Sequence, residues 1–448
     1  LRPDGVATGY DPYARLVIRR NDDATPTVPA SVFGELVFIA SNIDQGGVVR
    51  APLGRIWFDN YVQAYANGLP DPHVTFRSGS ITSASAAGLI MPFGGTSGGI
   101  TYQGADGTLL NLASASIVDT SGNTKIASGV SIGATSFVGE AGAVIDLTGG
   151  GTLTGAGFIS GRGGSVDVLK TVLVNANPIN NYSATGNKVY AILPGYKSGY
   201  APVAPENGAG DPVVGQQVTI PAGVPGLPAG TYTLLPSNYA LLPGAYRVEL
   251  AGTNTTPVAS PISIGNGTYA ASVSTGIANT AIRATLPVTA LITAGKSVRN
   301  YSQYNEQGYS DFLTANVTRF GGVRPLLPAD GKGLVLLFET PTSPTGESAL
   351  TFNGTALFQG AQDGNAGQVT LMRVGEIYAD VPTAGFNGVS VRASDLNAIA
   401  APRLTVNGSM LINNGTLLFL SAYLSNLYIR DGVSLNAGEL FFVGNNIV

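Results

Sequence analysis

The stretch Phe137-Val-Gly-Glu-Ala-Gly-Ala-Val-Ile-Asp-Leu147 is followed 21 residues later by Phe158-Ile-Ser-Gly-Arg-Gly-Gly-Ser-Val-Asp-Val168. The two stretches agree in their first two apolar residues, in one central glycine and in a closing apolar-Asp-apolar triplet. A third, weaker copy begins at Ile117, about 20 residues before Phe137. Self-similarity at a spacing of about 20 residues is typical of a repeat architecture in which each repeat forms one turn.

Short strand patterns fill each copy. Triplets such as Val130-Ser-Ile132 and Ile145-Asp-Leu147 point two apolar side chains to one face and one polar side chain to the other. Glycines between the triplets, among them Gly149-Gly150-Gly151, suit tight turns. Three short strands per turn, each pairing with its counterpart one turn on, predict an all-β fold. The predicted fold is a right-handed parallel β-helix, which is a solenoid.

The register of the two copies assigns an inside and an outside. Ile145 and Val166 are expected to stack in the apolar interior, one turn apart, with Asp146 and Asp167 stacked on the outer surface. Two stacked carboxylates about 4.8 Å apart are tolerable in water, and they are also a possible Ca²⁺ site. Solvated carboxylates are the favoured interpretation, so no metal or cofactor site is predicted.

Composition supports one long apolar-cored body. The chain has 448 residues, 61 of them glycine, with 44% hydrophobic and 11% charged residues. Its net charge of −4 and the lack of a basic cluster disfavour a nucleic-acid partner. No cysteine is present, which excludes disulfides and thiol metal sites. No run of 18 apolar residues occurs, so no membrane-spanning helix is expected.

Both ends of the chain carry the same strand pattern. A glycine followed by a charged residue and two or three apolar residues occurs at Gly34–Phe38, Gly54–Phe58, Gly375–Tyr378 and Gly438–Phe442. The sequence therefore predicts that residues 1–177 and 346–448 are two parts of one β-helix. The opening Leu1-Arg-Pro-Asp-Gly5 and the closing Val443–Val448 are not natural ends of such a body, so a longer chain is expected.

Residues 178–345 interrupt the repeat. They hold 17 of the 27 prolines and 11 of the 19 tyrosines, and proline cannot donate to a central ladder. The segment has a Leu-Pro motif of its own, and three of its stretches are predicted to be strands, namely Gln217–Ile220, Tyr232–Leu235 and Tyr246–Leu250. We expect an inserted, β-rich domain that lies outside the helix.

The glycine-rich repeats, Val189-Tyr-Ala-Ile-Leu-Pro-Gly-Tyr196 and the Leu-Pro-rich stretch from Leu227 to Tyr246 resemble the filamentous-haemagglutinin-like large exoproteins of Gram-negative bacteria. The resemblance covers most of the chain, and the Leu-Pro-Gly-Tyr block is its most specific part. It implies a secreted or cell-surface protein that is exported by two-partner secretion through an outer-membrane transporter. Members of this family act as adhesins, and some act in haem acquisition or contact inhibition.

Catalytic chemistry finds little support in the sequence. His73 is the only histidine, and it lies in a proline-rich stretch, where a plain exposed side chain is the favoured interpretation. Asp22-Asp23 is the only adjacent acidic pair, and a solvated turn is more plausible there than a catalytic dyad. No catalytic residue is therefore predicted, and the protein is not expected to be an enzyme. The alternative from another class is a β-helical polysaccharide lyase or hydrolase, which would need a carboxylate cluster in a side groove.

Tyrosine and asparagine in the insertion are the candidate contact residues. Both give amphipathic contact area that suits sugars and proteins, although tyrosines also form the core of small domains. Tyr301, Tyr304 and Tyr309, with Asn300 and Asn305, lie in the most polar stretch and are predicted to be the least buried. The predicted function is a segment of a large exported adhesin that contacts a surface glycan, a protein or a neighbouring copy through its insertion. A self-assembling filament subunit is a further alternative.

Overall fold

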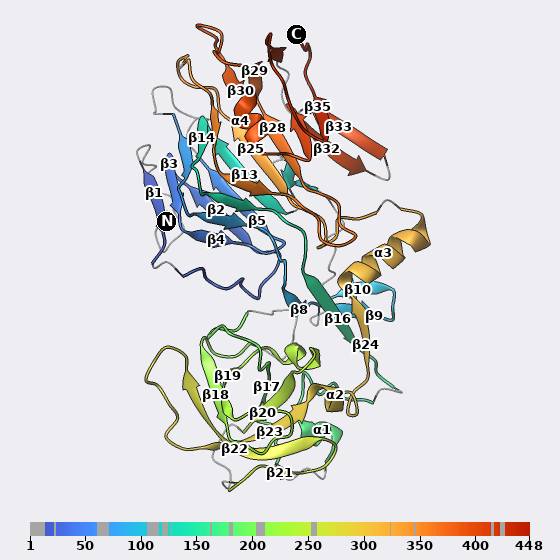
Figure 1. Cartoon of the computed structure of the whole chain (residues 1–448). Coiled ribbons are helices and arrows are strands. Elements are labelled where there is room, and N and C mark those ends of the chain that lie inside the picture. Colours follow the sequence, from blue (N-terminus) through green and yellow to red (C-terminus); the bar gives the residue numbers. More distant parts are fainter. Residues whose placement is uncertain are drawn as a thin grey trace, which may run out of the picture. The chain divides into compact units, whose positions relative to one another are not determined.

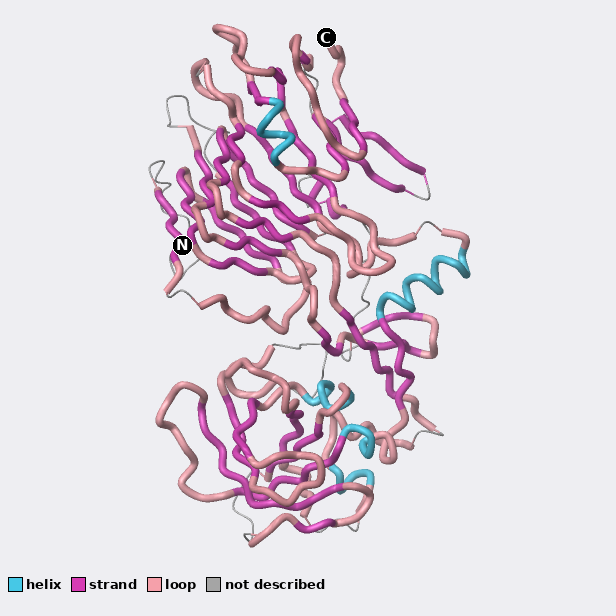
Figure 2. The backbone as a smooth tube through the Cα atoms, viewed as in Figure 1, coloured by secondary structure: helices cyan, strands magenta, loops and turns pink. Residues whose placement is uncertain are grey.

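The computed structural model describes residues 14–448 except 22–23, 61–70, 105–115, 119–123, 127, 162–163, 179–181, 203–210, 252–257, 323, 345, 414–415 and 422–425. The fold is mostly β, with 40% of the chain in strands and 9% in helices. Figures 1 and 2 show that parallel sheets dominate one part of the chain and an antiparallel half-barrel another. The predicted all-β class is confirmed at this level.

Two compact units make up the chain. The first unit contains residues 1–89, 112–151 and 317–448, and the second contains residues 90–111 and 152–316. The sequence-based boundaries, at 177/178 and 345/346, differ from this division. The insertion begins earlier because the strand after Gly151 pairs within the second unit. It also ends earlier, because Gly333–Phe338 pairs within the first.

Three parallel sheets form much of the first unit, and four successive passes of the chain each add one strand to all three. The first pass comprises β2 (Glu35–Ile39), β3 (Asn42–Gly46) and β4 (Val48–Arg50), and the second comprises β5 (Arg55–Asp59), β6 (His73–Phe76) and β7 (Ile81–Ser83). The third comprises β13 (Gly129–Ala134), β14 (Ser136–Gly139) and β15 (Val144–Asp146), and the fourth comprises β25 (Gly333–Phe338), β26 (Leu350–Phe352) and β27 (Thr355–Leu357).

The first of these sheets extends to seven strands through β28 (Gln368–Met372), β31 (Arg403–Val406) and β35 (Glu439–Phe442), and β1 (Arg15–Arg19) precedes β3 in the second. A further parallel sheet contains β29 (Val374–Tyr378), β30 (Val389–Arg392) and β34 (Tyr428–Ile429), beside helix α4 (Ala393–Ala398). Two antiparallel pairs complete the unit, β11 (Ser116–Val118) with β12 (Thr124–Ile126) and β32 (Gly408–Asn413) with β33 (Thr416–Ser421).

Aromatic side chains stack through the interior of the first unit. The ring centroids of Phe38, Phe58, Phe76 and Phe137 follow one another at 5.0–5.1 Å, and Phe352 continues the series at 6.3 Å. The same apolar cluster includes Ile56, Val130 and Leu334, which occupy one register position in β5, β13 and β25. Alternation along each strand therefore sends one set of side chains inward, as predicted for Ile145, which is fully buried.

The predicted repeat register is wrong. Phe137 lies beside Val74 and Leu350, and Ile145 lies beside Thr82 and Ala356. Phe158 lies in another unit, in a strand that is antiparallel to Tyr304–Gly308. A turn of about 20 residues occurs between Glu35 and Arg55, but neighbouring strands start 35 residues apart at Gly333 and Gln368. Chain passes of unequal length prevent a single sequence period.

The Gly-charged-apolar pattern predicts one sheet correctly in three of its four places. Gly34–Phe38, Gly54–Phe58 and Gly438–Phe442 correspond to β2, β5 and β35 of the seven-stranded sheet. Gly375–Tyr378 lies instead in β29, which pairs with β30 and β34. A short apolar strand after glycine suits any of these parallel sheets, so the pattern does not distinguish between them.

An antiparallel half-barrel forms most of the second unit. Its strand order is β17 (Lys188–Ile192), β20 (Tyr246–Leu250), β23 (Val288–Ala294), β22 (Thr268–Ile277), β18 (Gln216–Ile220) and β19 (Gly230–Thr233), with β21 (Ile262–Ser263) paired to β22. Reciprocal hydrogen bonds between Ala191 and Leu235 link the two ends of this series. The strands predicted at Gln217–Ile220 and Tyr246–Leu250 are confirmed.

The Leu-Pro motifs of the half-barrel form turns. Tyr196 N donates to Leu193 O, and Ala245 N donates to Leu242 O, so Leu-Pro-Gly closes a four-residue turn in both places. Gly244 has a φ of +75°, which glycine adopts without strain. The short helix η2 (Ser237–Leu241) precedes the second turn, and α1 (Leu173–Ala176) and α2 (Gly295–Val298) are single turns. The motif therefore has a structural role.

Candidate functional site

A small mixed sheet in the second unit carries the candidate site. Strand β16 (Thr152–Phe158) pairs in parallel with β8 (Ile90–Pro92) and antiparallel with β24 (Tyr304–Gly308). The hairpin of β9 (Gly95–Ser97) and β10 (Thr101–Gln103) packs on β16. A Cβ atom on Gly157 would overlap the carbonyl of Thr96, so glycine is needed for this close approach.

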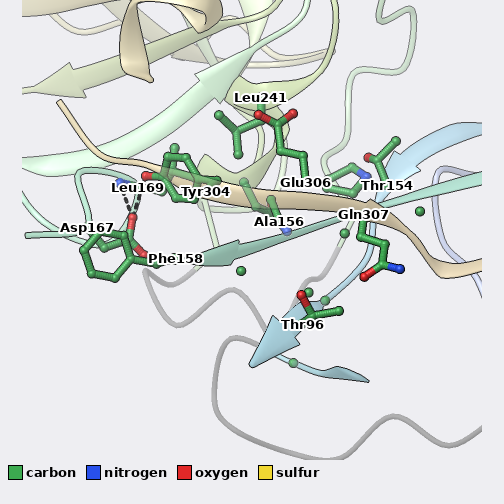
Figure 3. Close-up of a pocket in the computed structure, with 18 of the residues that line it drawn as sticks. Thr96, Thr154, Ala156, Phe158, Asp167, Leu169, Leu241, Tyr304, Glu306 and Gln307 are labelled. Carbon is green, nitrogen blue, oxygen red and sulfur yellow. Dashed lines mark hydrogen bonds between the residues drawn. The ribbon is translucent and has the colours of Figure 1, made fainter. Parts of the chain in front are cut away.

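A pocket of about 490 Å³ lies along this sheet, in the size range of small-molecule sites. Figure 3 shows that its lining comes from the β16–β24 ladder, from the loop around Asp167 and from Leu241 of η2. The apolar part of the lining consists of Phe158, Leu169, Leu241, Leu242 and Pro243. Polar groups come from Asp167, Lys170, Asn238, Arg299, Glu306 and Gln307.

Tyr304 contacts both the apolar and the polar part of the pocket lining. Its ring packs edge-on against Phe158 at a centroid distance of 6.2 Å, and its hydroxyl donates to Asp167 Oδ1 at 2.7 Å. Leu169 N donates to the same oxygen at 3.0 Å, as the dashed lines in Figure 3 mark. Burial, together with the negative charge of Asp167, raises the pKa of the Tyr304 phenol far above its usual range. Tyr304 is therefore a neutral hydrogen-bond donor at all physiological pH values.

Arg299 and Glu306 form a two-point ion pair beside this aromatic surface. Arg299 Nε and Nη2 donate to the two carboxylate oxygens of Glu306 at 2.5 and 2.6 Å. Arg299 also donates to the carbonyls of Gly295 and Leu241 at 2.8 and 3.0 Å. Its hydrogen bond with Glu306 raises the pKa of Arg299. A guanidinium with four such contacts is held in one geometry and presents a fixed polar edge to the pocket.

The side chain of Asn238 has a hydrogen-bond acceptor that receives no hydrogen bond. Its Oδ1 atom is buried and has no hydrogen-bond partner among the described residues, yet the side chain lines the pocket. A buried carbonyl oxygen without a donor costs free energy, on the order of 1–3 kcal/mol. A ligand hydroxyl or N–H that reached this oxygen would remove this cost.

The structure distributes the five predicted contact residues differently from the expectation. Tyr304 is the one that lines the pocket, but it is 9% exposed, and Tyr309 is 1% exposed. The prediction that these two are among the least buried tyrosines is wrong. They are covered because Tyr304, the first residue of β24, packs on Phe158, and because Tyr309, the first residue of α3 (Tyr309–Phe320), packs on Phe93 and Tyr102.

The other three residues do not line the pocket, and two of them make hydrogen bonds within the second unit. Asn305 Nδ2 donates to Thr96 Oγ1 at 2.6 Å and so ties β24 to β9. The Tyr301 hydroxyl is 2.9 Å from Thr268 Oγ1, and Asn300 is exposed outside the pocket lining. Sequence reasoning missed Phe158, Asn238, Arg299 and Glu306. One signal for two of these residues was present in the sequence. Arg299 and Glu306 are oppositely charged and lie on either side of the turn that leads into β24.

A second cluster of titratable groups lies in the first unit. Asp59 ends β5, Glu339 follows β25 and Arg373 follows β28, so all three lie at the same end of the seven-stranded sheet. Burial raises the pKa of Asp59, although Asn60 N donates to it. Burial and the nearby Asp59 charge also raise the pKa of Glu339, against the lowering effect of its ion-pair partner Arg373. The sequence analysis did not find this cluster.

The remaining predicted groups do not form a site. Asp146 lies in the first unit and accepts hydrogen bonds from Ser83 and Thr148, whereas Asp167 lies in the second, so the predicted carboxylate stack is wrong. His73 is exposed, with Nδ1 2.6 Å from Ser136 Oγ. Asp22 and Asp23 lie outside the described residues. Within the described ranges, no group of three or more His, Asp or Glu side chains is arranged to hold a metal ion.

Comparisons of the chain with protein-family models, with curated proteins and with solved structures found no match. Among the described helices, none is both long and apolar enough to span a membrane.

Proposed function

We propose that this chain is a segment of a secreted or cell-surface adhesive protein that is built on a right-handed parallel β-helix. Four passes that each supply a strand to the same three parallel sheets support the β-helix. The resemblance to filamentous-haemagglutinin-like exoproteins supports an exported adhesin, with an outer-membrane transporter as its export partner. The second unit, which interrupts the passes, supplies the binding site.

The pocket with the unpartnered Asn238 oxygen is the observation that carries this proposal. A sugar ring has an apolar face and a rim of hydroxyls. The pocket offers the Phe158 and Leu241 surfaces beside an unused acceptor and the fixed Arg299–Glu306 pair. The two positive and two negative side chains of the lining balance, which fits an uncharged ligand. The favoured partner is therefore a neutral surface glycan.

Two substitutions test the pocket. Phe158→Ala removes the aromatic surface, and Asn238→Leu removes the acceptor at similar volume. Each is expected to weaken binding to an array of neutral oligosaccharides about ten-fold or more, since central aromatic contacts dominate binding energies. Tyr200→Ala is the matched control, because Tyr200 is 50% exposed and does not line the pocket. Wild-type binding that survives both pocket substitutions would contradict the proposal.

The Asp59–Glu339–Arg373 cluster favours a second candidate, a β-helical carbohydrate-active enzyme. Two carboxyl groups with raised pKa values beside a cation are a recognised arrangement for general acid catalysis. In the second unit, by contrast, Asp167 and Glu306 are both engaged, by Tyr304 and by Arg299. We favour the adhesive protein because the pocket of about 490 Å³ lies in the second unit, and its lining does not include Asp59, Glu339 or Arg373.

The enzyme candidate is tested by the release of reducing or unsaturated ends from neutral and acidic polysaccharides at pH 4–9. The expected result is no release by the wild-type chain. If the wild-type chain releases such ends, Glu339→Gln and Asp59→Asn should be tested. Loss of release in both variants, with unfolding midpoints unchanged or raised, would show that the protein is an enzyme rather than an adhesive protein. The midpoints are not expected to fall, because each substitution removes a carboxylate whose ionised form is disfavoured by burial.

A further inference from the structure

We propose that the buried ion pair Arg247–Glu249 of the half-barrel is a positioning element for the pocket. The pair fixes the loop Val166–Leu173, from which Asp167, Leu169 and Lys170 line the pocket. This inference rests on the proposed function of the pocket as a binding site. It assigns a role to two side chains that do not themselves line the pocket.

Arg247 holds the first half of the loop. Its side chain is fully buried, and Nε donates to Val168 O at 2.7 Å while Nη2 donates to Thr171 O at 2.9 Å. Both carbonyls belong to the turn in which Lys170 N and Thr171 N donate to Asp167 O. A planar guanidinium that bridges two carbonyls three residues apart fixes the curvature of that turn.

Glu249 holds the other end of the same loop. It lies two residues further along β20 and accepts a hydrogen bond from Arg247 Nη2 at 2.9 Å. Leu173 N donates to its Oε2 at 2.8 Å, where the loop enters α1. Ser183 Oγ and Asn187 Nδ2 occupy its other oxygen at 2.5 and 2.8 Å. The carboxylate is therefore saturated, and one of its four donors is the backbone of the loop.

Two serines complete the attachment of the loop. Ser237 Oγ donates to Leu169 O at 2.5 Å, and Ser302 Oγ donates to Val166 O at 2.7 Å while it accepts from Val168 N. Consequently the carbonyls of residues 166, 168, 169 and 171 each accept from a side chain of the surrounding second unit. The Asp167 carboxylate is thereby placed to receive the Tyr304 hydroxyl.

Burial of the two charges works against the stability of this pair. It lowers the pKa of Arg247, against the raising effect of Glu249. Its Nη1 atom also lacks a hydrogen-bond partner among the described residues. Buried ion pairs can commonly be replaced by apolar residues without loss of stability. What an apolar pair could not supply is the set of hydrogen bonds to Val168, Thr171 and Leu173.

The test separates positioning from folding. The double variant Arg247→Met/Glu249→Leu keeps the volume of the pair and removes its hydrogen bonds. We expect the half-barrel to remain folded, with an unfolding midpoint equal to or above that of wild type. Amide hydrogens of Val168–Leu173 should exchange at least ten-fold faster. In ¹³C-tyrosine spectra assigned with Tyr304→Phe, the Tyr304 phenol should titrate at a lower pH than in the wild-type chain, because the loop no longer places the Asp167 charge against it.

Thr293→Val is the control, since Thr293 is buried in the same half-barrel and its hydroxyl is hydrogen-bonded to Thr268 Oγ1 rather than to the loop. It should leave loop exchange unchanged. A folded double variant with wild-type loop protection would overturn the proposal. If the double variant does not fold, Arg247→Lys decides, because it keeps the charge beside Glu249 and removes the planar guanidinium that bridges Val168 O and Thr171 O. Faster loop exchange in that variant supports positioning by buried side chains, and unchanged exchange refutes it. Neither readout needs a ligand, so loss of the proposed glycan binding would not affect the result.

Discussion

Ile145→Asp is expected to cost the first unit several kcal/mol of stability, whereas Asp146→Ala is expected to cost about 1 kcal/mol. Ile145 is fully buried among the apolar side chains of the first unit, between Thr82 and Ala356 of the neighbouring strands. A carboxylate there would have to ionise in an apolar interior or remain protonated at neutral pH. Asp146 points the other way and would lose its bonds with Ser83 and Thr148.

The measurement is urea unfolding followed by the fluorescence of Trp57, the only tryptophan of the chain, which lies in β5 of the first unit. Val144→Asp is the matched control, because Val144 is the other neighbour of Ile145 and is only partly buried. Equal shifts for Ile145→Asp and Val144→Asp would show that the inward register of β15 is wrong by one residue.

The inward position of Ile145 could be predicted because it depends only on alternation within a short strand. The strands that pair with β15 on either side could not be predicted from the sequence. Sequence similarity between Phe137–Leu147 and Phe158–Val168 suggested adjacent turns, but the strands beside Ile145 come from residues 81–83 and 355–357. A segment of more than 150 residues separates the third pass from the fourth. Local pattern carries no information about pairing across such an interruption.

Burial of the candidate tyrosines was mispredicted for a related reason. The stretch Asn300–Tyr309 is polar in composition, which suggested that its tyrosines are the least buried ones. Its residues 304–308 form a strand, and Tyr304 is buried there by packing on Phe158 and by its hydrogen bond to Asp167, while Glu306 remains exposed. The pocket itself combines residues from Pro92 to Gly308, and only the fold brings these together. The sequence also led to the prediction that the functional part lies in the segment that interrupts the repeat. That prediction is carried forward as a proposal.

Raising the pH from 7 to 9.5 is expected to stabilise the first unit by about 2 kcal/mol through Lys332 alone. Lys332 is 6% exposed, and burial lowers its pKa from 10.5 to about 8, against the raising effect of Asp330. The folded pKa lies below the unfolded one, so the unfolded chain binds more protons between the two values. Stability must therefore rise with pH through this window and be lowest where Lys332 is charged in both states.

Lys332→Met should remove most of this dependence. The ammonium group donates to the carbonyls of Pro328 and Asp330, and Pro328 O also accepts from Gly150 N, so the substitution leaves one of these carbonyls partnered. Relief from burying a charge outweighs the lost hydrogen bonds, and we expect a net gain of about 1 kcal/mol at pH 7. Urea unfolding of both chains at pH 7, 8.5 and 9.5, followed by Trp57 fluorescence, measures the difference. Lys188→Met, at an exposed lysine of the second unit, should keep the wild-type slope. A Lys332→Met variant with that same slope would show that Lys332 does not titrate in this range.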